Sequence, residues 1–128
     1  MKKEIERSGL ELVDGKLEFI CGVGRELLVA DTVGTSDENR FLYQGIDLSK
    51  QMLRDYYVRC GWYKELMNAR KAGLPDPLPP LMEEEYLTLV SETYRSICVA
   101  ITKERWDGDV KDLPTILGEY RKFIAKLQ

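Results

Sequence analysis

The sequence predicts an α+β fold in which a small antiparallel hairpin or sheet comes first and several helices follow. Two stretches near the N-terminus, LVDGKLEFI and ELLVADT, have the composition of strands and are separated by glycines. Beyond residue 47, apolar residues recur at helical spacing. Strands followed by helices are typical of the α+β class. We expect one domain over residues 1–128, because a chain of this length with 44% hydrophobic residues can bury one core.

Turn residues set the bounds of the first elements. Residues 2–7 can form a short helix that Ser8 and Gly9 end, since glycine readily adopts the left-handed conformation after a last turn. A first strand is expected from about Leu10 to Ile20 and a second from Glu26 to Thr32, with Gly22-Val23-Gly24 as the turn of a hairpin.

A polar loop and then helices are expected after the hairpin. The loop GTSDENR, residues 34–40, is of the kind that more often serves function than packing. The later elements share apolar stripes, capping residues or closely spaced prolines. They are a helix from Lys50 to about Cys60 capped by Asp47 or Ser49, a helix from Trp62 to Lys71 ended by Gly73, an extended connector from Leu74 to Leu81, a long helix after Met82 ending near Trp106, and a last helix capped by Asp112.

Composition excludes several classes of function. The net charge of -3 gives no basic field for nucleic acid or an anionic membrane. The three cysteines have no C-x-x-C spacing, so neither a zinc site nor a disulfide framework is expected, and we predict a reducing, cytoplasmic location. No apolar run is long enough to cross a bilayer. Histidine is absent, so any chemistry must use carboxylates, lysines, arginines and a hard metal ion.

The stretch VDGKLEF, residues 13–19, combines strand alternation with an unusual charge pattern. Its apolar side chains share one face of the strand, and Asp14, Lys16 and Glu18 share the other. Asp31 joins that face only if odd positions on one strand pair with even positions on the other, and the sequence does not fix this register. Alternating charges are most often a solvated surface, but a site for a metal and a phosphate also requires them.

The motifs resemble those of the C-terminal half of the phosphoribosylaminoimidazole-succinocarboxamide synthase (SAICAR synthetase) family. The family signature, an apolar pair followed by D-x-K-φ-E-F-G with φ apolar, matches Leu12 to Phe19, and Ile20 stands in place of the last glycine. The next family motif, roughly A-D-E-x-S-P-D-x-x-R, is similar to Ala30 to Arg40, although this loop is one residue longer and keeps neither the second acid nor the proline.

Later segments extend the resemblance over nearly the whole chain. The family pattern L-D-K-x-x-x-R-D is similar to Leu48 to Asp55, with Ser49 in place of the aspartate. The P-x-L-P connector and the helix after it resemble the segment from Pro77 to Tyr94. The resemblance implies an ATP-grasp-related, SAICAR synthase-like fold. The family's first half, which closes over ATP, has no counterpart among these residues, so we expect a separately encoded subunit, an expressed fragment or a degenerate relative.

The resemblance also implies an activity. Family members are ATP-dependent ligases of purine biosynthesis that join L-aspartate to the carboxylate of carboxyaminoimidazole ribonucleotide. ATP first phosphorylates that carboxylate, and the amine of aspartate then attacks the acyl phosphate. The implied cofactors are ATP and Mg²⁺, because magnesium and cationic side chains stabilise the charge on a transferring phosphoryl group.

The resemblance assigns roles to seven residues. Glu18 and Asp31 are implied metal ligands and, with Lys16, bind the nucleotide. Lys16 and Arg40 are the implied catalytic residues, since each can contact phosphate or a substrate carboxylate. The implied substrate-binding residues are Asp14, which would bind ribose hydroxyls or orient Lys16, Arg40 for a carboxylate or phosphate, and Lys50 with Arg54 for the carboxylates of aspartate.

Other interpretations stay open from sequence alone. Lys50 and Arg54 lie four residues apart, which also fits an exposed helix face. The chain as a whole could be a nucleotide-binding regulatory module without catalysis, or a scaffold whose open sheet edge pairs with a partner. The partners considered are the small-molecule substrates, an N-terminal lobe on another chain, and a second copy in a homo-oligomer; nucleic acid and membrane are not expected.

Overall fold

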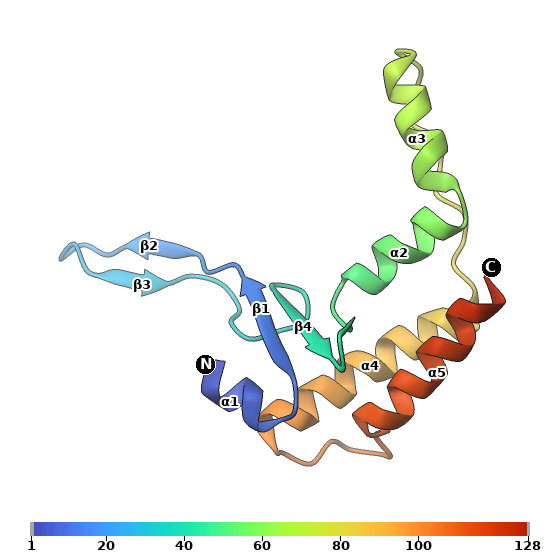
Figure 1. Ribbon diagram of the computed structural model, residues 1–128. Helices are drawn as coiled ribbons and strands as arrows, with labels where there is room; N and C mark the ends of the chain where they lie inside the picture. Colours follow the sequence, from blue (N-terminus) through green and yellow to red (C-terminus); the bar gives the residue numbers. More distant parts are fainter. Residues whose placement is uncertain (1, 128) are drawn as a thin grey trace.

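The computed structural model describes residues 2–127 and has the predicted α+β order of elements (Figure 1). Strands occupy the first part of the chain after one short helix, and helices occupy the rest. The elements are α1 (Lys2–Arg7), β1 (Glu11–Gly15), β2 (Phe19–Cys21), β3 (Leu27–Val29), β4 (Asn39–Tyr43), β5 (Ile46–Asp47), α2 (Gln51–Arg59), α3 (Trp62–Lys71), α4 (Glu84–Thr102) and α5 (Leu113–Lys126).

The strands form two antiparallel sheets. One has the order β1-β4-β5, and the other is the β2-β3 hairpin. The expected single strand from Leu10 to Ile20 is therefore wrong: it is interrupted at residues 16–18, and its two ends pair with different strands. A bulge between Leu12 and Asp14 in the pairing with β4 adds to this bend. The expected second strand is shorter than predicted, reaching only from Leu27 to Val29.

The β4-β5 hairpin was not predicted from sequence. Asn39 and Arg40 were assigned to the polar loop, but they begin β4, which pairs with β1. Gln44 and Gly45 connect β4 to β5, and both have positive φ values, of 50° and 77°. Positive φ at both central residues is the geometry of a two-residue hairpin turn, which is usually signalled by Asn-Gly or Asp-Gly. Gln-Gly is a weaker signal, and for this reason the hairpin was missed.

The helices follow the predicted order with two corrections. The N-cap residue of α2 is Lys50, without a side-chain capping bond, and not Asp47 or Ser49 as expected. α1 and α3 have the expected bounds, and Asp112 caps α5 by accepting a hydrogen bond from the Thr115 backbone N–H at 2.9 Å. The long helix α4 ends at Thr102 and not near Trp106. Lys103 adopts the left-handed conformation, with φ at 61°, and stops the helix one turn earlier than the apolar pattern suggested.

Aromatic side chains form the centre of the core. Tyr86 from α4 stacks on Tyr56 from α2, with ring centroids 5.1 Å apart, and on Phe123 from α5, at 4.6 Å. The Tyr86 hydroxyl donates a hydrogen bond to the Met52 carbonyl at 2.8 Å, so its polar atom is satisfied inside the protein. Burial raises the pKa of Tyr86 well above its usual value. These contacts join α2, α4 and α5 into one body.

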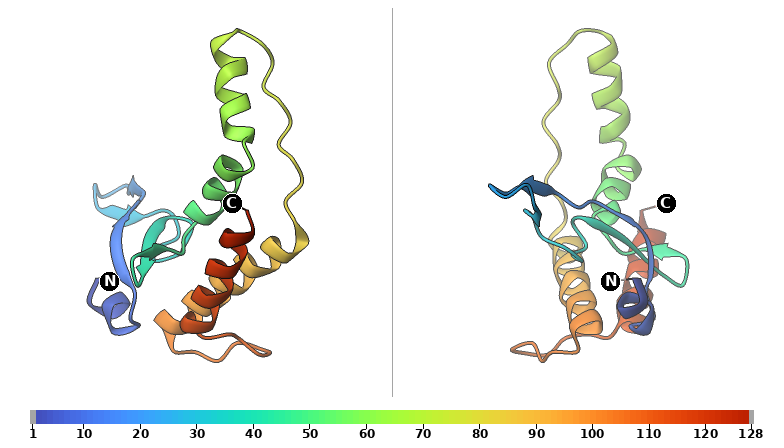
Figure 2. Two further views of the ribbon diagram at one scale, coloured as in Figure 1. Left: turned by 45° about the vertical axis from the view of Figure 1, so that its right-hand side comes forward. Right: turned by 90° about the vertical axis from the view of Figure 1, so that its left-hand side faces the viewer.

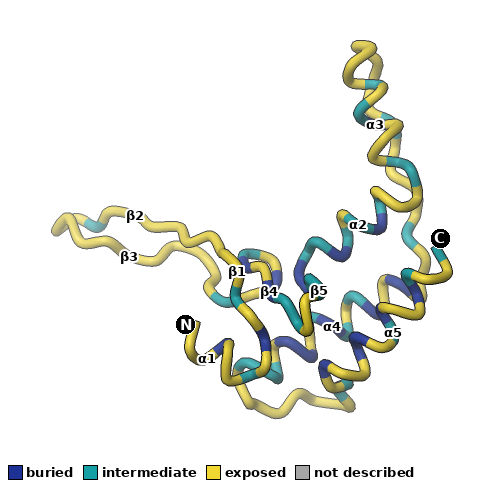
Figure 3. The backbone as a smooth tube through the Cα atoms, viewed as in Figure 1, coloured by how far each residue is buried: buried dark blue, intermediate teal, exposed yellow. Residues whose placement is uncertain are grey.

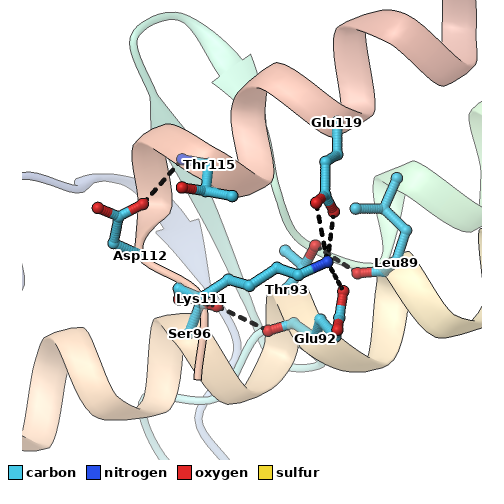
Figure 4. A network of polar contacts seen from close by, with 8 residues as sticks. All are labelled: Leu89, Glu92, Thr93, Ser96, Lys111, Asp112, Thr115 and Glu119. Atoms are coloured by element: carbon cyan, nitrogen blue, oxygen red, sulfur yellow. Dashed lines mark hydrogen bonds and ion pairs between the residues drawn. The ribbon is translucent and has the colours of Figure 1, made fainter. Parts of the chain in front are cut away.

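A second contact between α4 and α5 is polar (Figure 4). The Lys111 ammonium lies 2.8 Å from a carboxylate oxygen of Glu92 on α4 and 2.8 Å from one of Glu119 on α5. The two glutamates, Glu119 first, raise the pKa of Lys111. Ser96 donates to the Lys111 backbone carbonyl at 2.6 Å, which fixes the segment before α5 against α4. Because every charge here has a partner, we interpret this cluster as structural.

Two segments project from the body. The β2-β3 hairpin extends to one side, and α3 with the connector after it extends to another (Figures 1 and 2). The connector runs back along α3, held by the Trp62 ring N–H donating to the Pro77 carbonyl at 3.2 Å and by the ion pair of Arg70 with Asp76. The hairpin is exposed along almost its whole length, whereas α3 is partly covered and buries Leu66 (Figure 3). Within residues 2–127, no helix combines the length and apolarity needed to cross a membrane.

Candidate functional site

The candidate site begins where β1 ends, at the motif Asp14-Gly15-Lys16. Gly15 lies against the side chain of Asn39 on β4, and a Cβ at position 15 would overlap the Asn39 amide. Asn39 is only 2% exposed, and its side-chain oxygen accepts a hydrogen bond from the Gly34 N–H at 3.0 Å. The Lys16 N–H donates to the Glu38 carbonyl at 2.9 Å. These contacts tie the polar loop to the motif, and they explain why glycine stands between the two charged residues.

Asp14 and Arg40 are brought together as cross-strand partners on β1 and β4. The Arg40 Nε–H donates to Asp14 Oδ1 at 2.7 Å, and a second bond joins Nη2 to Oδ2, so the pair is bidentate. The hydrogen bond from Arg40 lowers the pKa of Asp14, and the same contact raises the pKa of Arg40. Both side chains are exposed, so the pair is accessible to a ligand.

Lys16 and Glu18 form an ion pair in the segment between β1 and β2. This contact shows that the two side chains point to the same side of the chain, as the predicted alternation requires. Hydrogen bonding to Glu18 raises the pKa of Lys16, and the charges of Glu38 and Asp31 raise it further. Lys16 therefore stands as a protonated cation among three carboxylates.

Asp31 follows β3, and the register of the hairpin determines its face. Phe19 pairs with Val29 and Ile20 with Leu28, so odd positions pair with odd and even with even. The Ala30 N–H donates to the Glu18 carbonyl at 3.0 Å, which places Ala30, and not Asp31, opposite Glu18. The condition for Asp31 to share the face of Glu18 is not met by this register. Asp31 instead accepts a hydrogen bond from the Thr32 N–H at 2.7 Å.

The structure does not test the metal assignment of Glu18 and Asp31. Across residues 2–127, no group of three or more Asp, Glu, Cys or His side chains is arranged to hold a metal ion. Magnesium, however, needs only one or two protein carboxylates when a nucleotide and water supply the other oxygens. The two carboxylates both lie in the neighbourhood of Lys16, and their role as ligands stays a prediction.

Lys50 and Arg54 lie at the start of α2, apart from the motif. Lys50 is 3.9 Å from a carboxylate oxygen of Asp37 in the polar loop. Arg54 donates to the side-chain oxygen of Gln51 at 3.3 Å and lies exposed on the same helix. The structure thus brings Lys50 to the loop that the motif anchors, whereas within residues 2–127 Arg54 has no hydrogen bond or ion pair with the other candidate residues.

Sequence reasoning missed Asn39 as part of this site. It is the residue before Arg40, it is buried, and its side-chain nitrogen is the one buried polar side-chain atom without a hydrogen-bond partner among residues 2–127. The sequence signal that could have indicated Asn39 is Gly15, because the missing side chain at position 15 leaves the space that the Asn39 amide occupies. That pairing depends on the register of β1 with β4, which residue patterns did not reveal.

Comparisons with known proteins agree on one family. The model of the family described as SAICAR synthetase matches residues 1–69. The chain is 36% identical over 113 residues to the phosphoribosylaminoimidazole-succinocarboxamide synthase of Thermoplasma acidophilum, a match that covers 83% of this chain and 38% of that protein. It is 36% identical over 110 residues to the enzyme of the same name from Thermoplasma volcanium, covering 80% and 37%. No solved structure gives a significant match.

The α+β fold and these matches assign the chain to a class of synthase domains. More specifically, the chain belongs to the SAICAR synthetase family, since the family model covers more than half of it, including β1, the hairpin and β4. The chain spans less than two fifths of the length of these relatives. The family assignment therefore concerns this part of the protein, and the activity of the whole enzyme is a proposal for it.

Proposed function

We propose that this chain supplies the nucleotide-binding and phosphate-binding face of an ATP-dependent ligase that joins L-aspartate to carboxyaminoimidazole ribonucleotide in purine biosynthesis. The observation that supports this most directly is the segment Asp14 to Glu18. It has the family motif, it lies within the matched region, and its charged side chains are exposed. The three free cysteines fit the reducing cytoplasm that we propose as its location.

Lys16 is proposed to bind the phosphates of ATP. Its ammonium is exposed and protonated, and its present partner, Glu18, sits two residues away on a short segment outside the strands. A nucleotide with Mg²⁺ would replace this internal pair: the phosphates take the place of Glu18 beside Lys16, and the freed Glu18 carboxylate turns to the metal. Asp31 would add a second carboxylate once its side chain leaves the Thr32 N–H. The metal supplies charge stabilisation at the transferring phosphoryl group.

Arg40 and Asp14 are proposed to act on the ribonucleotide. A guanidinium already aligned for bidentate bonding to Asp14 has the geometry to bind a substrate carboxylate or phosphate in the same way. Asp14 would then be free to accept from ribose hydroxyls. Lys50, which reaches the polar loop through Asp37, and Arg54 are proposed to bind the carboxylates of aspartate.

The proposed reaction has two steps. An oxygen of the substrate carboxylate attacks the γ-phosphorus of ATP, the bond to the β-phosphate oxygen breaks, and ADP leaves. The amine of aspartate then attacks the acyl carbon, the C–O bond to phosphate breaks, and the amine gives up a proton. Cations fixed near the site favour both steps because negative charge builds up on phosphoryl oxygens. The rest of the fold, in the form of an N-terminal lobe, is proposed to be required for turnover.

A second candidate function is a nucleotide-binding module without catalysis. The observation that favours it is that three of the four predicted cations already have a carboxylate partner within this chain, in the pairs Arg40 with Asp14, Lys16 with Glu18 and Lys50 with Asp37. The departures from the family motifs at Ile20, Thr32 and Ser49 point the same way. A homo-oligomer remains compatible with either function.

The test is ADP release from Mg-ATP with carboxyaminoimidazole ribonucleotide, in the presence and absence of L-aspartate. The chain is assayed alone and mixed with the portion of the Thermoplasma acidophilum enzyme that lies outside the matched region. Aspartate-dependent release in the mixture, lost in a Lys16→Ala variant, supports the ligase. Binding of Mg-ADP without any turnover in either sample supports the second candidate. Absence of both binding and turnover refutes both.

A further inference from the structure

A cavity of about 410 Å³ lies where the β4-β5 turn, α2 and α5 meet, and its lining carries charges of both signs. The charged residues are Asp47 at the end of β5, Asp55 and Arg59 on α2, and Arg121 on α5. The volume is within the range of small-molecule sites in proteins. None of these residues belongs to the proposed ligase site, and α5 lies beyond residues 1–69, which the family model matches.

The opposite charges around this cavity are not paired with one another. Asp55 and Arg59 lie four residues apart on α2, a spacing at which the two side chains can form an ion pair. Among residues 2–127, however, neither Arg59 nor Arg121 forms an ion pair. Both guanidinium groups therefore keep their hydrogen-bond donors for a ligand or for water.

Each aspartate has one carboxylate oxygen held by the protein. Asp47 Oδ1 accepts hydrogen bonds from the Ser49 N–H, at 2.9 Å, and from the Ser49 hydroxyl. Asp55 Oδ1 accepts one from the Gln51 side-chain N–H at 2.8 Å. In the described part of the chain, neither Oδ2 atom accepts a hydrogen bond. Because the bonds to Oδ1 fix each carboxylate, the Oδ2 atoms can serve as acceptors for a positively charged group.

Tyr120 adds a hydroxyl to the same cavity. The residue is only 6% exposed, and within residues 2–127 its hydroxyl has no hydrogen-bond partner. The hydroxyl oxygen is not among the fully buried polar atoms that lack a partner, so it is open to the cavity that Tyr120 lines. Burial raises the pKa of Tyr120, the charge of Asp55 raises it further and that of Arg59 lowers it, which places the hydroxyl near both groups. A polar group enclosed in this way needs a partner that the chain does not supply.

The mixture of charges indicates the class of ligand. A simple anion would be repelled by Asp47 and Asp55, and a simple cation by Arg59 and Arg121. A small molecule with one carboxylate and one ammonium group can pair with both sets of charges. The uncharged part of the lining, which is apolar, consists of Gly45, Ile46, Ile124 and Ala125.

We propose that this cavity binds a free α-amino acid with a small apolar side chain. The guanidinium groups of Arg59 and Arg121 donate to its carboxylate, and the Tyr120 hydroxyl donates to the same group. The Oδ2 atoms of Asp47 and Asp55 accept from its ammonium group. The apolar lining contacts its side chain. The inference does not rest on the proposed function, because the two sites share no residue.

The test uses L-valine and two analogues that each lack one of its charged groups. Isovalerate keeps the carboxylate without the amine, and isobutylamine keeps the amine without the carboxylate. L-Aspartate, the proposed co-substrate, is the fourth probe. Each probe is titrated into the chain at neutral pH, and nuclear magnetic resonance follows the backbone amides of residues 45–46 and 124–125, which line the cavity. The same titrations give the dissociation constants.

The proposal predicts that L-valine binds and shifts these amide signals. Each analogue should bind at least roughly tenfold more weakly, because it loses the hydrogen bonds to one set of charged side chains. L-Aspartate should also bind more weakly, since its second carboxylate would lie against the apolar lining. No shift with L-valine, or equal affinity for isovalerate, isobutylamine or L-aspartate at this cavity, would each overturn the proposal.

Variants test the individual contacts. Arg121→Gln and Asp55→Asn should each weaken L-valine binding at least roughly tenfold, and Tyr120→Phe roughly threefold. Asp55→Asn keeps the oxygen that accepts from Gln51, and circular dichroism verifies that each variant is folded. Arg95→Gln is the matched control, since Arg95 is an exposed arginine that lines a different cavity, and it should leave the affinity unchanged. Equal weakening by Arg95→Gln, or full affinity in Arg121→Gln, would contradict the assigned site.

Discussion

The body and the β2-β3 hairpin have similarly apolar sequences but opposite burial. Ile116 in α5 is 0% exposed and lies in the cluster with Tyr86 and Phe123, whereas Leu27 in β3 is 74% exposed. The body buries its apolar residues within this chain, so its sequence determines stability. The hairpin leaves its apolar side chains exposed, so they add little to the stability of the folded chain. The candidate site lies where these two regions meet, at residues 14–18.

The largest expected effect concerns ligand binding at the hairpin. Asp31→Asn removes a proposed metal ligand and should lower the affinity for Mg-ADP by more than roughly 100-fold, while the melting temperature stays unchanged. Calorimetric titration measures the affinity, and Glu26→Gln, which removes an exposed acid from the same hairpin, is the control. Unchanged affinity in Asp31→Asn would remove this residue from the site.

The next prediction compares how much the body and the hairpin contribute to the stability of the chain. Ile116→Ala leaves a cavity in the core and should lower the free energy of unfolding by about 2–5 kcal/mol. Leu27→Ala should change it by less than about 0.5 kcal/mol, because the side chain is exposed. Urea denaturation of the two variants measures both values. Similar losses in both would show that the hairpin is part of the cooperative core, contrary to this account.

The connection between the body and the β2-β3 hairpin is tested at Gly15. Gly15→Ala introduces a Cβ that overlaps the buried Asn39 amide, and the resulting displacement should cost about 1–3 kcal/mol of unfolding free energy. The double variant with Asn39→Ala should recover part of this loss, because the overlapping group is gone. If the losses of unfolding free energy in Gly15→Ala and Asn39→Ala simply add in the double variant, the Cβ at position 15 does not overlap the Asn39 amide as described.

A smaller effect is expected inside the body. Tyr86→Phe removes the hydrogen bond to the Met52 carbonyl, at a cost of about 0.5–1.5 kcal/mol. Tyr63→Phe on the exposed surface of α3 is the comparison and should have no measurable effect. Thermal unfolding of both variants separates them, and equal melting temperatures would contradict the assigned role of the bond.

The smallest effect is a pH dependence at the site. Arg40 lowers the pKa of Asp14 in the folded chain, so the stability from this pair is present above the unfolded pKa of about 3.9 and is lost as the pH falls through the folded value. Because both groups are exposed, the loss should be slight. The Arg40→Gln variant should lack this part of the acid dependence. Identical acid profiles for the two proteins would indicate that the pair contributes nothing.

Local signals predicted much of this fold. The glycine after α1, the bounds of α3 and the Asp112 cap depend on neighbouring residues, and each was confirmed. The interruption of the first strand and the β4-β5 hairpin depend on which distant segments pair, and sequence patterns did not show them. The early end of α4 results from one residue, Lys103, in a conformation that its type does not suggest.

The site was predictable in composition but not in arrangement. The motif identified the charged residues, and the ion pair of Lys16 with Glu18 agrees with the predicted face. The bidentate pairing of Asp14 with Arg40 and the burial of Asn39 both follow from the register of β1 with β4. The odd-with-odd register of the hairpin, which turns Asp31 from Glu18, is likewise a property of the fold and not of local sequence.

The most direct test of the difference between body and hairpin is amide hydrogen exchange, measured on this chain. The account predicts that amides of α4 and α5 are protected, whereas amides of residues 18–30 exchange rapidly. Protection of the hairpin equal to that of α4 and α5 would contradict the account.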